Sequence, residues 1–220
     1  MRKGLTIIGI LAFVGLFALS VGYVGSDNND YIDSPSKEAE TFLVEENVSV
    51  QGQEDLAEAN WDNFKVEVNG KVLAFPFSIL ELEEAGFTLD EEDTDGTAKV
   101  PAESFRLACF RDEEGNEIMV SLQNGSEKEQ SFLQCEVGSL TVEGTSIEEG
   151  GADVVFPGGV MLGMEEGKVL STYGTEAERS EFDGKILYTW AKEGNYYQSV
   201  DVMVDAKSGE VVHLTMTMFS

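Results

Sequence analysis

Apolar and polar residues alternate along much of the chain after Trp61, which is the period of β-strands with one buried face. The first such run, 64–68, ends at Asn69-Gly70, and a second run, 71–75, follows directly. Asn-Gly between two alternating runs predicts a tight β-hairpin, because both central residues of the favoured turn need positive φ.

A short helix is predicted after this hairpin. Ser78 and Glu81 have the spacing of a capping box, and Gly86 follows the run 79–85 as a C-cap. Three further alternating runs, separated by turn sequences, predict three antiparallel strands. These runs span 105–111, 118–122 and 133–137.

The last third of the chain repeats this order. Residues 154–156 and 160–162 flank a Pro-Gly-Gly turn, and 165–173 has a helical apolar face. Three more alternating runs then follow, at 185–190, 196–204 and 211–219. The order of hairpin, short helix and three-stranded meander therefore occurs twice, which predicts an internal duplication. We expect an α+β fold of two related modules, 61–145 and 152–220, each an antiparallel sheet with one short helix on a face.

The N-terminus has the pattern of an export segment. Two basic residues, Arg2 and Lys3, precede an uninterrupted apolar run over 5–25. The length of this run favours a retained membrane anchor, and a cleaved signal peptide stays open as the alternative. Either assignment for 1–26 places the rest of the chain outside the cytoplasm, because the positive residues keep the short N-terminus inside.

Acidic residues dominate the composition. The chain has 42 Asp+Glu against 14 Lys+Arg, a formal net charge of −28. Residues 27–60 hold one base, Lys37, and few apolar side chains, so they predict an acidic disordered linker. Such a charge repels nucleic acid and anionic membrane, and it suits cationic partners, divalent ions or simple solubility. We therefore expect membrane contact only through the N-terminal segment.

The acidic loop 90–96 is the candidate metal site. Glu91, Asp93 and Asp95, followed by a glycine, have the spacing of the first half of a calcium-binding loop. The twelfth position of such a loop is Ala102 here, where a bidentate Glu is needed. The sequence allows either a weak calcium site or a solvated acidic loop, and it predicts no other cofactor.

Two cysteines and one histidine limit the remaining chemistry. Cys109 and Cys135 fall on inward positions of the first and third predicted strands, about 9.6 Å apart, whereas a disulfide tolerates about 7 Å. Two alternatives stay open: a disulfide bond between Cys109 and Cys135, or two buried free thiols. His213 shares the polar face of the last strand with Thr215 and Thr217, so we expect an exposed sheet residue rather than a catalytic base.

Aromatic residues gather on the hairpin of the last meander. Trp190, Tyr196 and Tyr197 form either a ligand platform for sugars or part of the core. Trp190 alternates in phase with Ile186, and the helix 165–173 needs such a surface to cover. The pattern predicts that Trp190 is buried against this helix.

One stretch of the chain resembles the motif of a known family. It consists of Gly163-Met164-Glu165-Glu166, Val169 and Tyr173-Gly174, and it precedes a meander. This stretch resembles the small repeat of β-lactamase-inhibitor-like proteins and of the small outer-membrane assembly lipoproteins. With Gly86-Phe87 and Cys135-Glu136-Val137, the chain also resembles exported proteins of Gram-positive, clostridia-like bacteria. The resemblance implies non-enzymatic protein–protein or cell-envelope work. The leader has no cysteine, unlike the lipoproteins, so attachment through a lipidated cysteine is excluded.

These observations predict an extracytoplasmic, non-enzymatic interaction module of the cell envelope, presented on an acidic spacer to a protein or cell-wall partner. A carbohydrate- or peptidoglycan-binding module is the alternative. A secreted hydrolase that uses Asp and Glu is a third candidate, and no nucleophile or base motif accompanies it.

Overall fold

The computed structural model describes residues 56–144, 146–193 and 195–219. The predicted leader and most of the predicted linker lie outside these residues. Leu56 is buried, so packing begins slightly before the predicted boundary at Trp61. A search of the described residues for a helix of membrane-spanning length and hydropathy finds none.

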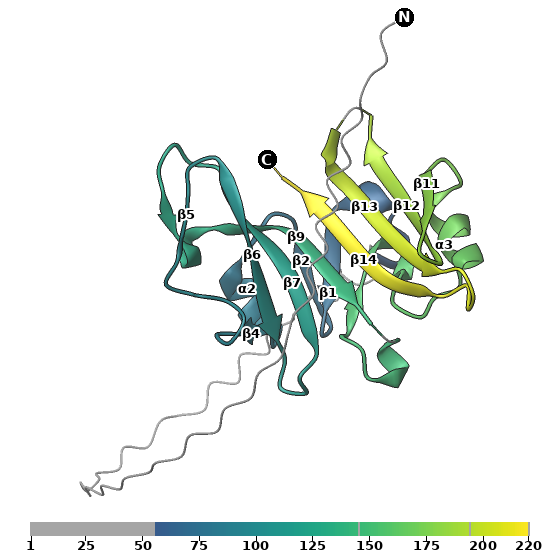
Figure 1. The fold of residues 1–220 in the computed structure, drawn as a ribbon, viewed down its shortest axis with the longest axis horizontal. Coiled ribbons are helices and arrows are strands. Elements are labelled where there is room, and N and C mark those ends of the chain that lie inside the picture. The colour runs from purple at the N-terminus through teal and green to yellow at the C-terminus, as the bar shows by residue number, and fades with distance from the viewer. Residues whose placement is uncertain (1–55, 145, 194, 220) are drawn as a thin grey trace, which may run out of the picture. The chain divides into compact units, whose positions relative to one another are not determined.

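One antiparallel sheet of nine strands organises the described residues (Figure 1). Eight strands follow one another in the order β11-β12-β13-β14-β9-β7-β6-β4, and β3 pairs with β9 outside this path. The strands are β3 (Phe77–Ser78), β4 (Thr88–Leu89), β6 (Ser104–Arg111), β7 (Glu117–Asn124), β9 (Glu136–Glu143), β11 (Glu178–Phe182), β12 (Lys185–Lys192), β13 (Asn195–Asp205) and β14 (Val211–Met218).

The expected α+β fold of two separate modules is wrong. The described part is mostly β-structure, and it has only two α-helices, α2 (Ile79–Glu84) and α3 (Glu166–Tyr173). The third strand of the first meander, β9, pairs with the last strand of the second meander, β14, with Thr141 opposite Thr215. The two meanders are therefore halves of one sheet rather than sheets of their own.

The expected hairpin at 154–162 does not form either. β10 (Val154–Val155) pairs with β1 (Lys65–Val68), which also pairs with β2 (Lys71–Ala74) in a separate three-stranded sheet. The return run makes a single bridge, between Phe156 and Val160. The remaining elements are β5 (Lys99–Val100), β8 (Gln130–Ser131) and the 3-10 turns Trp61–Asn63, Phe132–Gln134, Ile147–Glu149 and Pro157–Gly159.

The turn and cap signals are confirmed. Asn69 and Gly70 have φ of 48° and 78°, as the tight hairpin turn requires. Ser78 and Glu81 form the reciprocal capping box at the start of α2. Gly174 follows α3 with φ of 86°, which is accessible to glycine without strain.

The strand expected at 133–137 is misplaced. Phe132–Gln134 forms a 3-10 turn with Leu133 69% exposed, and β9 begins only at Glu136.

One face of the large sheet is a continuous core. In the middle of the sheet, residues that lie directly opposite one another on six neighbouring strands are all buried. This core row consists of Trp190, Val200, Met216, Leu140, Val120 and Ala108. The row crosses the β14–β9 junction without interruption, so the two meanders share one hydrophobic core.

We call the opposite side of the sheet the open face. Its middle is a stripe of hydroxyl groups, in which Ser139 Oγ lies 3.2 Å from Thr217 Oγ1 and Thr141 Oγ1 lies 2.9 Å from Thr215 Oγ1. Both pairs bridge β9 and β14, so hydroxyl hydrogen bonds reinforce the junction on the side away from the core.

Candidate functional site

Large apolar side chains lie exposed on the open face of the first meander. Phe105 and Leu107 on β6 are 56% and 51% exposed, and Met119 on β7 is 45% exposed. Phe105 and Leu107 share a face because strand residues alternate with a period of two, and Met119 lies diagonally across from Leu107. Exposed apolar residues that cluster in this way are unusual on a free surface.

Phe219 extends this surface toward the second meander. Its ring stacks on Phe105 with the centroids 5.5 Å apart, and its backbone N–H donates to the carbonyl of Tyr197. Tyr197 in turn meets the edge of the Phe219 ring at 6.2 Å. We call Phe105, Leu107, Met119, Tyr197 and Phe219 the aromatic patch.

Gly138 on β9 makes room for the Phe219 ring. A Cβ atom at Gly138 would lie only 2.5 Å from Phe219 Cδ1. The ring therefore lies directly against the backbone of the sheet, at a position that any side chain would close. This absence of a side chain lets the end of the chain connect the two halves of the open face.

Polar groups of the open face lie in the hydroxyl stripe beside the patch. Burial raises the pKa of Asp201, whose carboxylate accepts a hydrogen bond from Thr189 Oγ1. His213 Nε2 lies 3.0 Å from Thr215 Oγ1, and His213 Nδ1 lies 3.4 Å from a carboxylate oxygen of Glu143. His213 lies on the expected polar face of the last strand, but its side chain is only 25% exposed, so the expectation of an exposed residue is not met.

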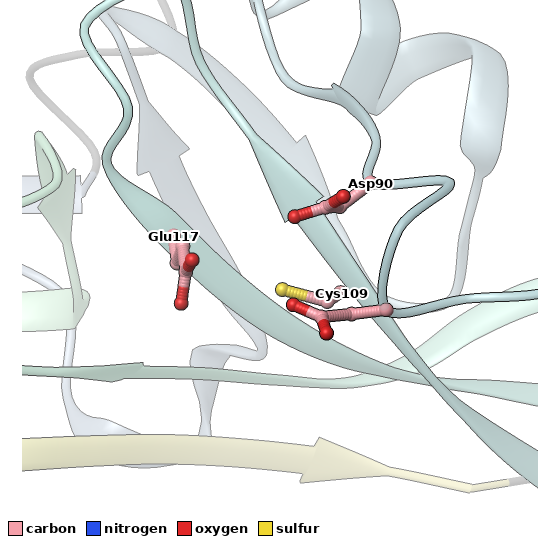
Figure 2. Close-up of side chains that lie close together, drawn as sticks. Asp90, Cys109 and Glu117 are labelled. Carbon is pink, nitrogen blue, oxygen red and sulfur yellow. The ribbon is translucent and has the colours of Figure 1, made fainter. Parts of the chain in front are cut away.

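A cluster of titratable groups lies at the outer end of the same face. Asp90, Asp93, Cys109 and Glu117 each offer one ligand atom, and these atoms lie within 4.8 Å of one another. Figure 2 shows Asp90, Cys109 and Glu117 converging from the acidic loop and from two neighbouring strands. The loop is held against β6, since the N–H of Cys109 donates to Thr94 Oγ1 at 2.9 Å.

The three acids of the expected calcium loop do not come together. Only Asp93 belongs to the cluster, while the side chain of Glu91 is exposed. Asp95 accepts hydrogen bonds from the hydroxyl and the backbone N–H of Thr97, and these bonds lower its pKa. Of the three expected ligands, only Asp93 therefore joins the cluster, where it meets Cys109 of β6 and Glu117 of β7.

A guanidinium already pairs with two of the three carboxylates of this cluster. Arg111 Nη2 lies 2.8 Å from Asp90 Oδ2, and the same nitrogen forms a short ion pair with Glu117. Asp90 has only 5% of its side chain exposed, so its charge needs a close partner. A divalent cation would have to displace Arg111 or lie beside it. The arrangement fits an internal ion-pair network better than a metal centre.

The two cysteines are free thiols on different sides of the sheet. The expectation that both point inward is wrong for Cys109, which alternates out of phase with Ala108 and Phe110 and lies half-buried on the open face. Burial raises the pKa of Cys109 to about 11, and the charges of Glu117, Asp90 and Asp93 act in the same direction. A thiol with this pKa is protonated at neutral pH and is a poor nucleophile and metal ligand.

The aromatic residues of the last meander separate into core and surface. Trp190 is 3% exposed and meets the ring of Tyr173 edge-on at 5.3 Å, which confirms its expected burial against the helix. Tyr196 and Tyr197 are 60% and 67% exposed. The structure therefore does not place Trp190 beside the two tyrosines on one exposed face.

The patch residues Phe105, Leu107 and Phe219 were not singled out from the sequence. A signal was present at β6, where apolar residues occur on both faces of the strand: Phe105 and Leu107 on one side, Ala108 and Phe110 on the other. A strand with one solvated face should show polar residues there. The position of Phe219 depends on Gly138 and Tyr197, which are distant in sequence, so no local pattern could predict it.

No protein-family model, no curated protein and no solved structure matches the chain.

Proposed function

We propose that the chain is an extracytoplasmic, non-enzymatic interaction module that binds a partner protein through the aromatic patch. The observation that supports this proposal is the exposure of Phe105, Leu107 and Met119 side by side on the open face of a sheet whose other face is packed. Aromatic residues and Met are enriched in the buried centres of protein interfaces. A rigid sheet holds these side chains in place, so little ordering cost attends their burial in a complex.

The charges around the patch indicate the chemistry of the partner. Glu136 on β9 pairs with Gln123, the residue opposite Phe105, whereas Glu117 near Met119 is already paired with Arg111. Glu136 is exposed, and the whole chain is strongly acidic. An apolar surface with an acidic rim fits a protein segment whose apolar side chains are flanked by Lys or Arg.

Selection from a random peptide library tests this site on the full chain. We expect the selected peptides to combine aromatic or aliphatic residues with Lys or Arg. A double substitution, Phe105→Ser with Leu107→Ser, should weaken their binding by about tenfold or more, since buried apolar anchors dominate such contacts.

Matched control substitutions are available elsewhere on the surface. Leu80 and Leu133 are 61% and 69% exposed and lie outside the patch. Leu80→Ser with Leu133→Ser should leave binding unchanged. Equal binding by the patch variant, or selection of acidic peptides, would contradict the proposal. Binding of peptidoglycan fragments that depended on Tyr197 would favour the carbohydrate-binding alternative.

The proposed location outside the cytoplasm rests on the N-terminal apolar run. Fractionation of expressing cells, followed by determination of the N-terminus, tests it. Membrane-bound protein that keeps Arg2 and Lys3 would support the anchor, and a soluble exported form that begins at Val21 or Asp27 would show a cleaved signal peptide. Recovery in the cytoplasm would contradict both.

A further inference from the structure

The strand β11 forms one edge of the large sheet, and its outer side has no partner strand among the described residues (Figure 1). All five of its residues, Glu178–Phe182, are exposed. On its inner side it pairs with β12, from Glu178 opposite Thr189 to Phe182 opposite Lys185. An exposed edge of this kind is a template for strand addition unless its side chains prevent it.

The hairpin turn determines which backbone groups of β11 point outward. Asp183 and Gly184 have φ of 48° and 73°, as in a two-residue turn of the primed type. Phe182 and Lys185 flank this turn and form a hydrogen-bonded pair, and such pairs alternate along an antiparallel ladder. The N–H and C=O groups of Arg179 and Glu181 therefore point away from β12, toward the free edge.

The charges on these two residues select a partner. In a symmetric antiparallel pair of two β11 strands that keeps the faces of both sheets aligned and pairs at least three residues of each strand, the central residue can be Arg179, Ser180 or Glu181. Centring on Arg179 or on Glu181 places like charges opposite each other. Centring on Ser180 places Arg179 of each copy opposite Glu181 of the other, on the same face.

We propose that two copies of this chain associate edge to edge through β11, centred on Ser180, and join their sheets into one. Arg179 and Glu181 supply both the outward backbone groups and the complementary charges of this contact. Within one copy these side chains already approach each other, with Arg179 Nη2 3.3 Å from Glu181 Oε2. Edge charges usually prevent strand addition. Here the charges of Arg179 and Glu181 disfavour pairing with other strands and the two other symmetric registers of self-pairing. They favour the one register that is centred on Ser180. This surface is distinct from the aromatic patch, so the inference goes beyond the proposed function.

Cysteine cross-linking of the full-length chain tests the contact. Ser180 faces its own copy in a non-hydrogen-bonded pair, where the Cα atoms are about 4.5 Å apart, within the range of about 4.4–6.8 Å that a disulfide allows. Membranes or secreted fractions of cells that express Ser180→Cys are treated with a mild oxidant at about 0.15 M salt, where repulsion beyond roughly 8 Å is screened. We expect a covalent dimer on a non-reducing gel.

Two controls define the background of this assay. The unsubstituted chain reports on Cys109 and Cys135, and Ser171→Cys places a thiol at an exposed position of α3. Both should give little dimer. A dimer fraction for Ser180→Cys no higher than that of Ser171→Cys would overturn the proposal.

Charge exchange tests the register. In the Ser180→Cys background, Arg179→Glu or Glu181→Arg alone should lower the dimer fraction by about tenfold, because two like-charge pairs replace two opposite pairs. The double variant, Arg179→Glu with Glu181→Arg, again places opposite charges across the contact and should restore the dimer. Single variants that cross-link like the parent, or a double variant as weak as the singles, would overturn it.

Discussion

Gly138 determines where the ring of Phe219 can lie. The ring occupies the space that a side chain on β9 would fill, and it holds the C-terminal residues against the open face. The backbone of Gly138 has no positive φ, so alanine is allowed there on conformational grounds. The requirement for glycine therefore comes from its neighbours, mainly the Phe219 ring at 2.5 Å and to a lesser degree Gln123 Cδ at 3.1 Å.

Substitution of Gly138 by Ala should release Phe219 from the open face. The new Cβ would clash with its ring, so the Phe219 N–H, which donates to the Tyr197 carbonyl, should exchange with solvent faster than in the parent. Gly167→Ala is the matched control, because a Cβ there meets nothing within 4 Å. Phe219→Ala should raise the rate similarly, and adding Gly138→Ala to it should change nothing further. If Gly138→Ala still raised the rate in the Phe219→Ala background, Gly138 would act through a contact other than the Phe219 ring.

The thiol of Cys109 should react only in strong alkali. Its pKa of about 11 lies above the value near 9 of a free thiol, since burial and three nearby carboxylates disfavour the thiolate. Alkylation by iodoacetamide, followed from pH 7 to 12, should therefore have its midpoint near 11, and Glu117→Gln should lower it. A raised pKa in the folded state also means that this group's stabilising contribution is present below about pH 9 and is lost as the pH rises through 11. A midpoint below 9 would contradict the description of this site.

At the scale of elements, the contact of β12 with α3 should dominate the stability of the second meander. Trp190 packs on Tyr173, and its Nε1 donates to the carbonyl of Gly174 at 3.2 Å. Trp190→Ala should cost about 3–5 kcal/mol of unfolding free energy, measured by denaturant titration. Leu133→Ala, at an exposed position, should stay within about 0.5 kcal/mol. Equal effects of the two substitutions would refute the assignment of Trp190 to the core.

The elements that the sequence predicted are those whose signals are local. The Asn69-Gly70 turn, the Ser78–Glu81 cap and the strands of the second meander depend on residues a few positions apart. Alternation also predicted the buried face of β12, because it reports which side chains point the same way, but it was read out of phase on β6 and too early for β9. It contains no information on which strand lies alongside, so the pairings of β10 with β1 and of β14 with β9 were missed.

The candidate site was predicted less well than the fold, for a related physical reason. The aromatic patch and the Asp90–Glu117 cluster each combine side chains from several strands and a loop. Asp93 was identified because it belongs to a dense acidic loop, whereas its neighbour Cys109 was assigned to the core. One error of strand phase moved Cys109 to the wrong face, since successive side chains alternate between faces.

At the scale of the whole molecule, the shared core row should make unfolding a single transition. Tryptophan fluorescence reports on Trp61 and Trp190, while Cys135 is buried in the first meander. In a Cys109→Ser variant, alkylation of Cys135 and the fluorescence change should have the same denaturant midpoint. Trp190→Ala should shift both midpoints equally. Two separate midpoints would show that the meanders unfold independently despite the β9–β14 ladder.

The junction between β9 and β14 also imposes an order on folding during synthesis. Synthesis delivers β9 long before β14, which begins only at Val211. Until that segment emerges, the peptide groups on one side of β9 have no hydrogen-bond partners, and Leu140 and Val142 lack part of their packing. Another strand could pair with β9 during that time. If the chain crosses a membrane, completion of the sheet must wait for its final segment to arrive on the far side. A chaperone that shields exposed strands would be needed most during that interval.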